Sequence, residues 1–291
     1  MEHIREFSYF EGRKLLYVHG FGSSGQSNTP RLLRQMLPAA EVLAPDLPVH
    51  PHEALDMLRA LAAAEHPAVV VGTSMGGMFA EMLRGYDRIL VNPAFNLYET
   101  LRTNIGLGKV TFFNPRSDGV QEFMLTKSLL EEYRDVTLQN FQGSDDETEQ
   151  QRVVGIFGTH DDMVHTEDIF RRHYRHAVSF DGGHRLNDSV LLHSLMPLLQ
   201  RMDQRQQGAA RPVVYVHSSA LQNRSEALHG MEMLAQRYDV YAVCPHADAA
   251  CEEIPSLQTA TFLYRRRVRT DSLGMLLGDY LVTSDFPESD A

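Results

Sequence analysis

The sequence predicts an α/β protein in which a mostly parallel sheet has helices on both faces, followed by a small C-terminal α/β appendage. Short runs rich in valine, leucine and isoleucine alternate along the chain with segments whose apolar residues recur at helical spacing. Around residues 68–85, one such run passes through a glycine-flanked turn directly into a helical pattern. Strands that alternate with helices lie parallel, because each helix returns the chain to the same edge of the sheet.

Length and composition are typical of a globular protein. The 291 residues suffice for one sizeable core and a second small one, and 43% of them are hydrophobic and 22% charged. The net charge of −11 repels phosphate backbones and anionic lipid head groups, so we expect neither a nucleic-acid nor a membrane partner. The first residues lack the apolar stretch of a signal peptide, and Cys244 and Cys251 are too few for a disulfide framework. We therefore expect a cytoplasmic protein.

The first third of the chain predicts a regular alternation of strands and helices. Lys14-Leu-Leu-Tyr-Val18 is apolar enough for a buried strand, and we expect an edge strand near residues 4–10 before it. Ser27 to Thr29 are candidate N-caps of the first helix, with Pro30 in its first turn. The further elements expected here are a strand at 41–45, a helix at 52–65, a strand at 69–71, a helix that starts at 75 and stops at 85, and a strand at 88–93.

The segment between about residues 94 and 151 is predicted to be a largely irregular insertion. Its pattern contains one helical piece near 121–134 and an acidic loop at 144–149. Long insertions between two strands are more often functional than idle, and we expect this one to form a lid.

The alternation resumes after the insertion and predicts the domain limits. We expect a strand at 153–158, a helix at 166–173, a strand at 177–180 and a helix at 187–202. The polar stretch 203–211 indicates a linker, so the first domain is expected to span 1–205. The C-terminal region, 206–291, is expected to contain strands at 212–216, 240–243 and 261–264 and a helix at 224–237.

Gly72-Thr-Ser-Met-Gly76 is a G-x-S-x-G pattern between a strand and a helix. Such a turn strains the serine backbone and lifts the Ser74 hydroxyl off the end of the sheet. Gly72 and Gly76 leave room, because a Cβ at either position would crowd the turn. The helix that starts at Met75 directs its free N–H groups toward the reacting centre. Ser74 is therefore the candidate nucleophile.

A serine nucleophile needs a base, and the base needs a carboxylate that orients it. With this type of turn the chain order is serine, acid, histidine. Asp161 follows the strand at 153–158, and His184 follows the strand at 177–180 in Gly182-Gly-His184. The carboxyl ends of such strands form the usual ligand site of an open α/β sheet. Asp162 is the nearest competitor, and we prefer Asp161 from its position in the turn.

An oxyanion intermediate requires two backbone N–H donors. We assign them to Met75, which follows the nucleophile, and to Phe21 in the loop after the first strand. That loop meets the dinucleotide pattern only in part, at Gly20, Gly22 and Gly25, and it lacks the G-K-[ST] ending of a phosphate-binding loop.

A metal site is a further possibility near Asp161, because His160 and His165 flank it. Their spacing matches neither of the common histidine motifs of zinc sites. We therefore expect no metal and no cofactor.

These motifs resemble the α/β-hydrolase superfamily and, within it, the YqiA/YcfP-like bacterial esterases. The resemblance covers roughly residues 14–200 and rests on Tyr17-Val-His-Gly-Phe-Gly-Ser-Ser24, Val71-Gly-Thr-Ser-Met-Gly-Gly77, Leu90-Val-Asn-Pro-Ala94, Gly158-Thr-His-Asp161 and Gly182-Gly-His184. It implies a carboxylic ester or thioester hydrolase with Ser74, Asp161 and His184 as the catalytic triad. Residues after about 208 have no counterpart in that pattern.

The expected partner is a small acyl ester or thioester, cleaved through an acyl-enzyme. Phe95, Tyr98, Phe112 and Phe113 are candidates for an apolar acyl pocket, although packing of the insertion onto the body explains them equally well. Amide and C–C bond hydrolysis stay open, because they pass through similar oxyanion states. The alternative is a catalytically silent scaffold that binds a ligand or partner. The C-terminal region is a candidate contact for a homo-oligomer.

Overall fold

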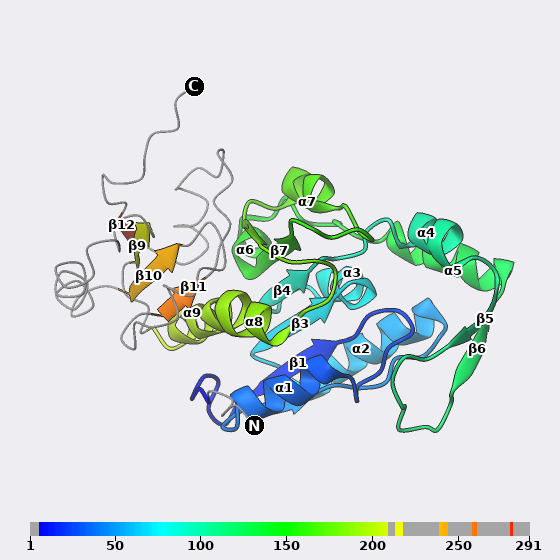
Figure 1. Ribbon diagram of the computed structural model, residues 1–291, viewed down its shortest axis with the longest axis horizontal. Helices are drawn as coiled ribbons and strands as arrows, with labels where there is room; N and C mark the ends of the chain where they lie inside the picture. Colours follow the sequence, from blue (N-terminus) through cyan, green and yellow to red (C-terminus); the bar gives the residue numbers. More distant parts are fainter. Residues whose placement is uncertain (1–5, 209–212, 218–238, 244–257, 261–279, 282–291) are drawn as a thin grey trace. The chain divides into compact units, whose positions relative to one another are not determined.

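The computed structural model describes residues 6–208 and four short strands beyond them, at 213–217, 239–243, 258–260 and 280–281 (Figure 1). The chain divides into two compact units. The first unit comprises Met1–Gly155 and Asp161–Arg175, and the second comprises Ile156–His160 and His176–Ala291.

The main sheet has six strands in the order β2-β1-β3-β4-β7-β8. Pairing is parallel between β1 and β2, between β1 and β3, and between β3 and β4. Their valines, leucines and isoleucines are almost all buried, as the continuous apolar runs predicted. The bounds are β1 Lys14–Val18, β2 Glu41–Leu43, β3 Val69–Thr73, β4 Arg88–Val91, β7 Val153–Gly158 and β8 Ala177–Phe180.

Four helices of the first unit follow its strands: α1 Asn28–Met36, α2 Pro51–Glu65, α3 Met75–Glu81 and α7 Glu167–His173. Ser27 is the N-cap residue of α1, and Pro30 lies in its first turn, as predicted. The α2 helix begins at a proline and ends where His66 adopts a left-handed conformation. The α1 and α2 helices each bury one apolar face, which for α2 includes Ala54, Leu55 and Leu58, whereas α3 is buried along its whole length.

The insertion is not irregular, and that expectation is wrong. It contains a two-stranded antiparallel sheet, in which Val110 pairs with Phe123, and two capped helices. The side chain of Thr126 caps the first of these helices, and that of Asp146 caps the second, so part of the acidic loop is helical. The elements are α4 Leu97–Thr100, a short π-helix η1 at Leu101–Ile105, β5 Gly108–Thr111, β6 Glu122–Leu125, α5 Lys127–Thr137 and α6 Glu147–Arg152.

In the second unit, β8 is followed by a short helix α8 at Asp188–Val190, a short π-helix η2 at Leu191–Leu195, and α9 at Met196–Gln206. The predicted end of this helix at 202 is wrong, because α9 continues into the polar stretch expected to be a linker. Residues 6–10 form no strand, contrary to the predicted edge strand.

A separate four-stranded parallel sheet has the order β11-β10-β9-β12. Its strands are β9 Val213–His217, β10 Asp239–Val243, β11 Gln258–Ala260 and β12 Tyr280–Leu281. The predicted strands near 212–216 and 240–243 are confirmed. The predicted helix at 224–237, the predicted strand at 261–264 and both cysteines lie outside the described residues. Within the part of the chain that the structure describes, no helix is both long and apolar enough to cross a lipid bilayer.

Candidate active site

Ser74 occupies a strained turn between β3 and α3. Its backbone angles are φ 56° and ψ −120°, a combination that residues with a Cβ rarely adopt. The Ser74 N–H donates to the carbonyl of Val91 at 2.9 Å, and its carbonyl accepts from the N–H groups of Gly77 and Met78 at 2.9 and 3.1 Å. These bonds hold the serine in the conformation that the sequence motif predicted.

The turn leaves no room for a side chain at Gly72 or Gly76. A Cβ on Gly72 would overlap the carbonyl oxygen of Gly76, and a Cβ on Gly76 would overlap that of Val18. Both overlaps involve backbone atoms, which cannot rotate away. The turn therefore lies tightly against the end of β1.

The loop after β1 is held by a buried neutral histidine. The Leu47 N–H donates to Nε2 of His19 at 3.1 Å, so Nδ1 carries the proton and donates to the Gly20 carbonyl at 2.9 Å. Burial lowers the pKa of His19 to about 4, so the ring stays uncharged at neutral pH. Gly20 lies against the nucleophile, because a Cβ at this glycine would sit 3.3 Å from the Ser74 Cβ.

The connection between β5 and β6 is hydrogen-bonded to that same loop. The Phe113 N–H donates to the Gly22 carbonyl at 2.8 Å, and the Ser24 hydroxyl donates to the Pro115 carbonyl at 2.7 Å. Asp46 links the two segments, because it accepts from Gly25 N at 2.8 Å and from both N and Oγ of Ser117 at 2.6 Å. This part of the insertion is fastened to the loop that carries the candidate oxyanion donor Phe21.

Partial burial would raise the pKa of Asp46. The hydrogen bonds from Ser117 and Gly25, helped by the charge of Arg116, outweigh it and hold that pKa below its ordinary value. The carboxylate is therefore charged at neutral pH, where it is the stronger acceptor.

Asp161 and Asp162 differ sharply in their surroundings. The Asp161 side chain is 6% exposed, and its Oδ1 accepts from the N–H groups of Met163 and Val164 at 2.8 and 2.9 Å. Asp162 is exposed, as is His165. Only Asp161 has the fixed, sheltered position that an orienting carboxylate needs, which favours it over Asp162.

His184 belongs to the second unit, in the loop after β8, and is half-buried. Its pairing with Asp161 and Ser74 stays a prediction. His160, also in the second unit, has its Nε2 2.9 Å from Oδ1 of Asp181. Among the residues that the structure describes, no group of three histidine, cysteine or acidic side chains is placed to hold a metal ion.

The four aromatic residues predicted to line a pocket have different environments. Phe112 and Phe123 pack with their ring centroids 5.1 Å apart, and Phe123 lies 5.5 Å from the ring of Phe21. Phe113 follows Phe112 and is 65% exposed.

The other two predicted pocket residues lie elsewhere in the first unit. Phe95 is buried against Phe141, with centroids 4.5 Å apart. Tyr98 lies under the guanidinium groups of Arg102 and Arg134, at 5.9 and 6.0 Å.

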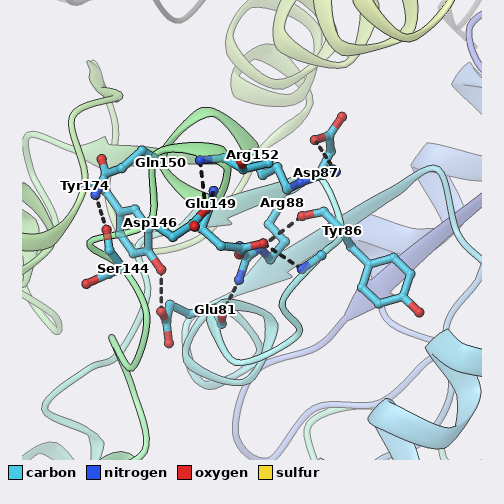
Figure 2. Close-up of polar contacts among 12 residues, drawn as sticks. Glu81, Tyr86, Asp87, Arg88, Ser144, Asp146, Glu149, Gln150, Arg152 and Tyr174 are labelled. Carbon is cyan, nitrogen blue, oxygen red and sulfur yellow. Dashed lines mark hydrogen bonds and ion pairs between the residues drawn. The ribbon is translucent and has the colours of Figure 1, made fainter.

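The far end of α3 is anchored by buried charges (Figure 2). Arg88 is fully buried and donates to the carboxylate of Glu149, to the Glu81 carbonyl and, at 3.1 Å, to the Tyr86 carbonyl. The Glu81 carboxylate accepts from the hydroxyl of Tyr174 at 2.6 Å. Burial, followed by the charge of Glu81, raises the pKa of Tyr174, so this hydroxyl stays protonated.

Sequence reasoning did not find roles for His19, Asp46 or Arg88. The histidine lay within a recognised motif, but its role depends on Leu47, which is far along the chain. Asp46 lies outside the recognised motifs, and its partner Ser117 is 71 residues further along the chain. Arg88 opens a strand, where a charged residue ordinarily indicates an exposed end.

Comparison with solved structures finds similar proteins at low identity. The chain is similar to the esterase domain of a Rhodothermus marinus protein, with 19% identity, 59% of this chain and 78% of that chain covered, and a TM-score of 0.39. It is similar to Est1E from Butyrivibrio proteoclasticus, with 16% identity, coverage of 68% and 88%, and a TM-score of 0.43. A variant of tomato methylketone synthase I gives 12% identity, coverage of 68% and 98%, and a TM-score of 0.45.

The sheet topology and the backbone of Ser74 together identify the fold. A mostly parallel six-stranded sheet with a strained serine between β3 and α3 is the arrangement of the α/β-hydrolase fold, which confirms the predicted fold class. Residues 14–199 match the model of the Uncharacterised protein family UPF0227, the same stretch over which the motifs resemble YqiA/YcfP-like proteins. The chain therefore belongs to the UPF0227 family of α/β-hydrolase proteins.

Proposed function

We propose that this protein is a serine hydrolase that cleaves carboxylic esters or thioesters of small acyl groups. The observation that carries the proposal is the strained backbone of Ser74, at φ 56° and ψ −120°, in the turn between β3 and α3. Strain of this kind persists only where the surroundings impose it, and it presents the hydroxyl for attack. A catalytically silent scaffold would have no need of it.

In the proposed reaction, the Ser74 oxygen attacks the acyl carbonyl while His184 accepts the hydroxyl proton. Asp161 orients the imidazole and stabilises its protonated form. The C–O or C–S bond of the tetrahedral intermediate then breaks, and His184 protonates the leaving alcohol or thiol. Water, deprotonated by the same histidine, hydrolyses the acyl-enzyme and releases the carboxylic acid.

The proposed oxyanion donors are the backbone N–H groups of Met75 and Phe21. Met75 opens α3, ahead of Gly77, whose N–H is the first to bond to the Ser74 carbonyl. Phe21 lies in the loop that His19 and Asp46 hold in place. Donors that are fixed before the reaction cost no reorganisation when negative charge develops.

We assign the binding site of the acyl group to the aromatic residues of the insertion. Phe112 and Phe113 are the members of this set nearest the oxyanion loop, the loop after β1 that carries Phe21. Support comes from the bond between the Phe113 N–H and the Gly22 carbonyl at 2.8 Å. Phe95 and Tyr98, which come earlier in the insertion, are the two further candidates for this pocket.

A fluorophosphonate probe and two substrate series, aryl esters and acyl-CoA thioesters of increasing chain length, test this proposal. We expect labelling at Ser74 and turnover of at least one series. Ser74→Ala should abolish labelling and lower kcat by about 10³-fold or more. Ser128→Ala, which changes an exposed serine on α5, is the matched control and should behave as wild type.

Two outcomes contradict parts of the proposal. Absence of labelling in the folded wild-type protein would favour the silent scaffold. Labelling at Ser74 without turnover of either series would exclude the assigned substrate class and direct attention to amide or C–C bond hydrolysis.

A further inference from the structure

Thr166 uses its hydroxyl in an unexpected way. It is the N-cap residue of α7, where a threonine side chain ordinarily accepts an N–H from the first helical turn. No such capping bond is present at this helix end. The hydroxyl instead donates to the carbonyl of Pro93, 73 residues earlier in the chain, and the residue is 1% exposed. The Thr166 hydroxyl therefore links α7 to a distant segment of the chain instead of capping its own helix.

Pro93 belongs to the segment that holds the nucleophile. The N–H of Ala94, the next residue, donates to the Ser74 carbonyl at 3.0 Å. Val91, two residues before Pro93, accepts from the Ser74 N–H at 2.9 Å. The segment 91–94 therefore bonds both peptide groups of Ser74, and the Thr166 hydroxyl bonds the middle of that segment.

Thr166 also ends the turn that contains Asp161. The Asp161 carboxylate accepts from the N–H groups of Met163 and Val164, which fixes the turn internally, and Val164 is buried. The segment Asp161–Arg175 belongs to the first unit, whereas the residues before and after it belong to the second. The acid turn is thus part of the same compact unit as the nucleophile.

A second bond joins the same two parts at their far ends. The hydroxyl of Tyr174, the residue after α7, donates to the carboxylate of Glu81, the last residue of α3, at 2.6 Å (Figure 2). The segment Asp161–Arg175 is consequently tied to the turn at Ser74 through Thr166, and to the far end of α3 through Tyr174.

We propose that Thr166 is a positioning residue that fixes the Asp161 carboxylate relative to Ser74 through the Pro93 carbonyl. The proposal rests on the proposed function, because it assigns Asp161 to the catalytic acid. Thr166 touches neither substrate nor reacting atoms. A serine, an imidazole and a carboxylate act together only within narrow limits of geometry, and a displacement of about 1 Å can cost about 10²-fold in rate.

The test compares Thr166→Val with Thr166→Ser. Valine keeps the shape of threonine without the hydroxyl, and serine keeps the hydroxyl. We expect Thr166→Val to lower kcat for the best ester about 10- to 100-fold, with KM within about twofold of wild type. Thr166→Ser should retain most of the wild-type kcat.

Thr137→Val is the matched control for lost stability. Thr137 lies on α5 in the same unit, and its hydroxyl donates to the Tyr133 carbonyl at 2.7 Å. We expect this variant to lose a similar amount of thermal stability and to keep the wild-type kcat. An equal loss of kcat in the two valine variants would reduce Thr166 to a structural role and overturn the proposal.

The pH profile supplies a readout that stability alone would not move. A carboxylate that orients the imidazole also stabilises its protonated form, so a loosened Asp161 changes the pH dependence of the reaction. We expect the acid limb of kcat/KM to move to lower pH in Thr166→Val and to stay in place in Thr166→Ser. An unshifted limb in Thr166→Val contradicts the proposal. Should Thr166→Val not fold, Thr166→Ala measures the same loss of the hydroxyl.

Fluorophosphonate labelling separates the two proposals. A wild-type protein that is not labelled at Ser74 overturns both. A wild type that is labelled, together with a Thr166→Val variant that is labelled at the same rate, leaves the proposed function standing and overturns the positioning role alone.

Discussion

Replacement of Arg88 by methionine should strongly destabilise the first unit. Arg88 is completely buried, and its guanidinium supplies the donors for Glu149, for the Glu81 carbonyl and for the Tyr86 carbonyl. Methionine fills a similar volume but donates nothing, so the Glu149 carboxylate loses its cation and two carbonyls lose a donor. Removing one partner of a buried ion pair costs about 3–5 kcal/mol.

The loss is measurable by urea and thermal unfolding. For a domain of this size, 1 kcal/mol lowers Tm by about 2–4 °C, so Arg88→Met should lower Tm by roughly 6–20 °C. Glu149→Gln leaves the arginine charge without its counterion and should also destabilise. The double variant should be more stable than the sum of the two losses predicts, by about 0.5–3 kcal/mol, because the partners are removed together.

Arg59→Met is the control, because Arg59 forms a solvent-exposed ion pair with Asp56 at 3.9 Å. Exposed pairs contribute at most about 1 kcal/mol. If Arg88→Met costs no more than Arg59→Met, the buried pair does not anchor α3, and the reasoning from burial is refuted.

Three further changes have defined outcomes. Gly76→Ala places a Cβ on the carbonyl oxygen of Val18, so we expect a loss of about 1–3 kcal/mol in unfolding and about 100-fold in kcat/KM; wild-type turnover of the ester would contradict this. The hydrogen bond that His50 donates to the Glu132 carboxylate raises the pKa of His50, so the contribution of this pair to stability is present below the unfolded pKa of about 6.5 and is lost as pH rises through the folded value. The free energies of unfolding of wild type and His50→Gln, measured in urea, should therefore differ at about pH 5.5, by no more than about 1 kcal/mol, and converge by about pH 9; a constant difference would exclude the pair. Asp46→Asn weakens the acceptor that joins the oxyanion loop to the insertion, so we expect kcat to fall about tenfold and proteolysis of residues 112–121 to accelerate, as checked by steady-state assay and mass spectrometry of the fragments.

The parts of the fold that depend on local pattern were predictable from the sequence. The strands predicted at 14–18, 153–158 and 177–180 coincide with β1, β7 and β8, because continuous apolar runs between polar turns have clear limits. The strained turn at Ser74 was predictable for the same reason, since Gly72 and Gly76 lie within two residues of it.

The β5–β6 sheet was missed because its connection is not a local turn. Ten residues, 112–121, join the strands, and hydrogen bonds to Gly22, Ser24 and Asp46 hold them in place. Sequence rules recognise hairpins by short loops of two to five residues. The aromatic and β-branched run at 110–113 was the available signal.

The roles of Glu81 and Arg88 could not be predicted from neighbouring residues. Charged side chains are usually exposed. Arg88 and Glu81 can be buried because Glu149 and Tyr174, which are distant in the sequence, bond to them. The assignment of Asp161 over Asp162 rested on position alone, and the structure adds that only Asp161 is sheltered.

The fastening of the β5–β6 connection to the oxyanion loop limits how this protein can diversify. A change in length within residues 112–121 would pull on Gly22 and Ser24, so a new substrate preference gained there would come with altered turnover. Among the residues that the structure describes, the exposed side chains of Ile105 and Leu107, on the segment before β5, form no such hydrogen bond to the loop after β1. Substitutions at residues 105–107 should therefore leave turnover unchanged, whereas changes of length within 112–121 should alter it.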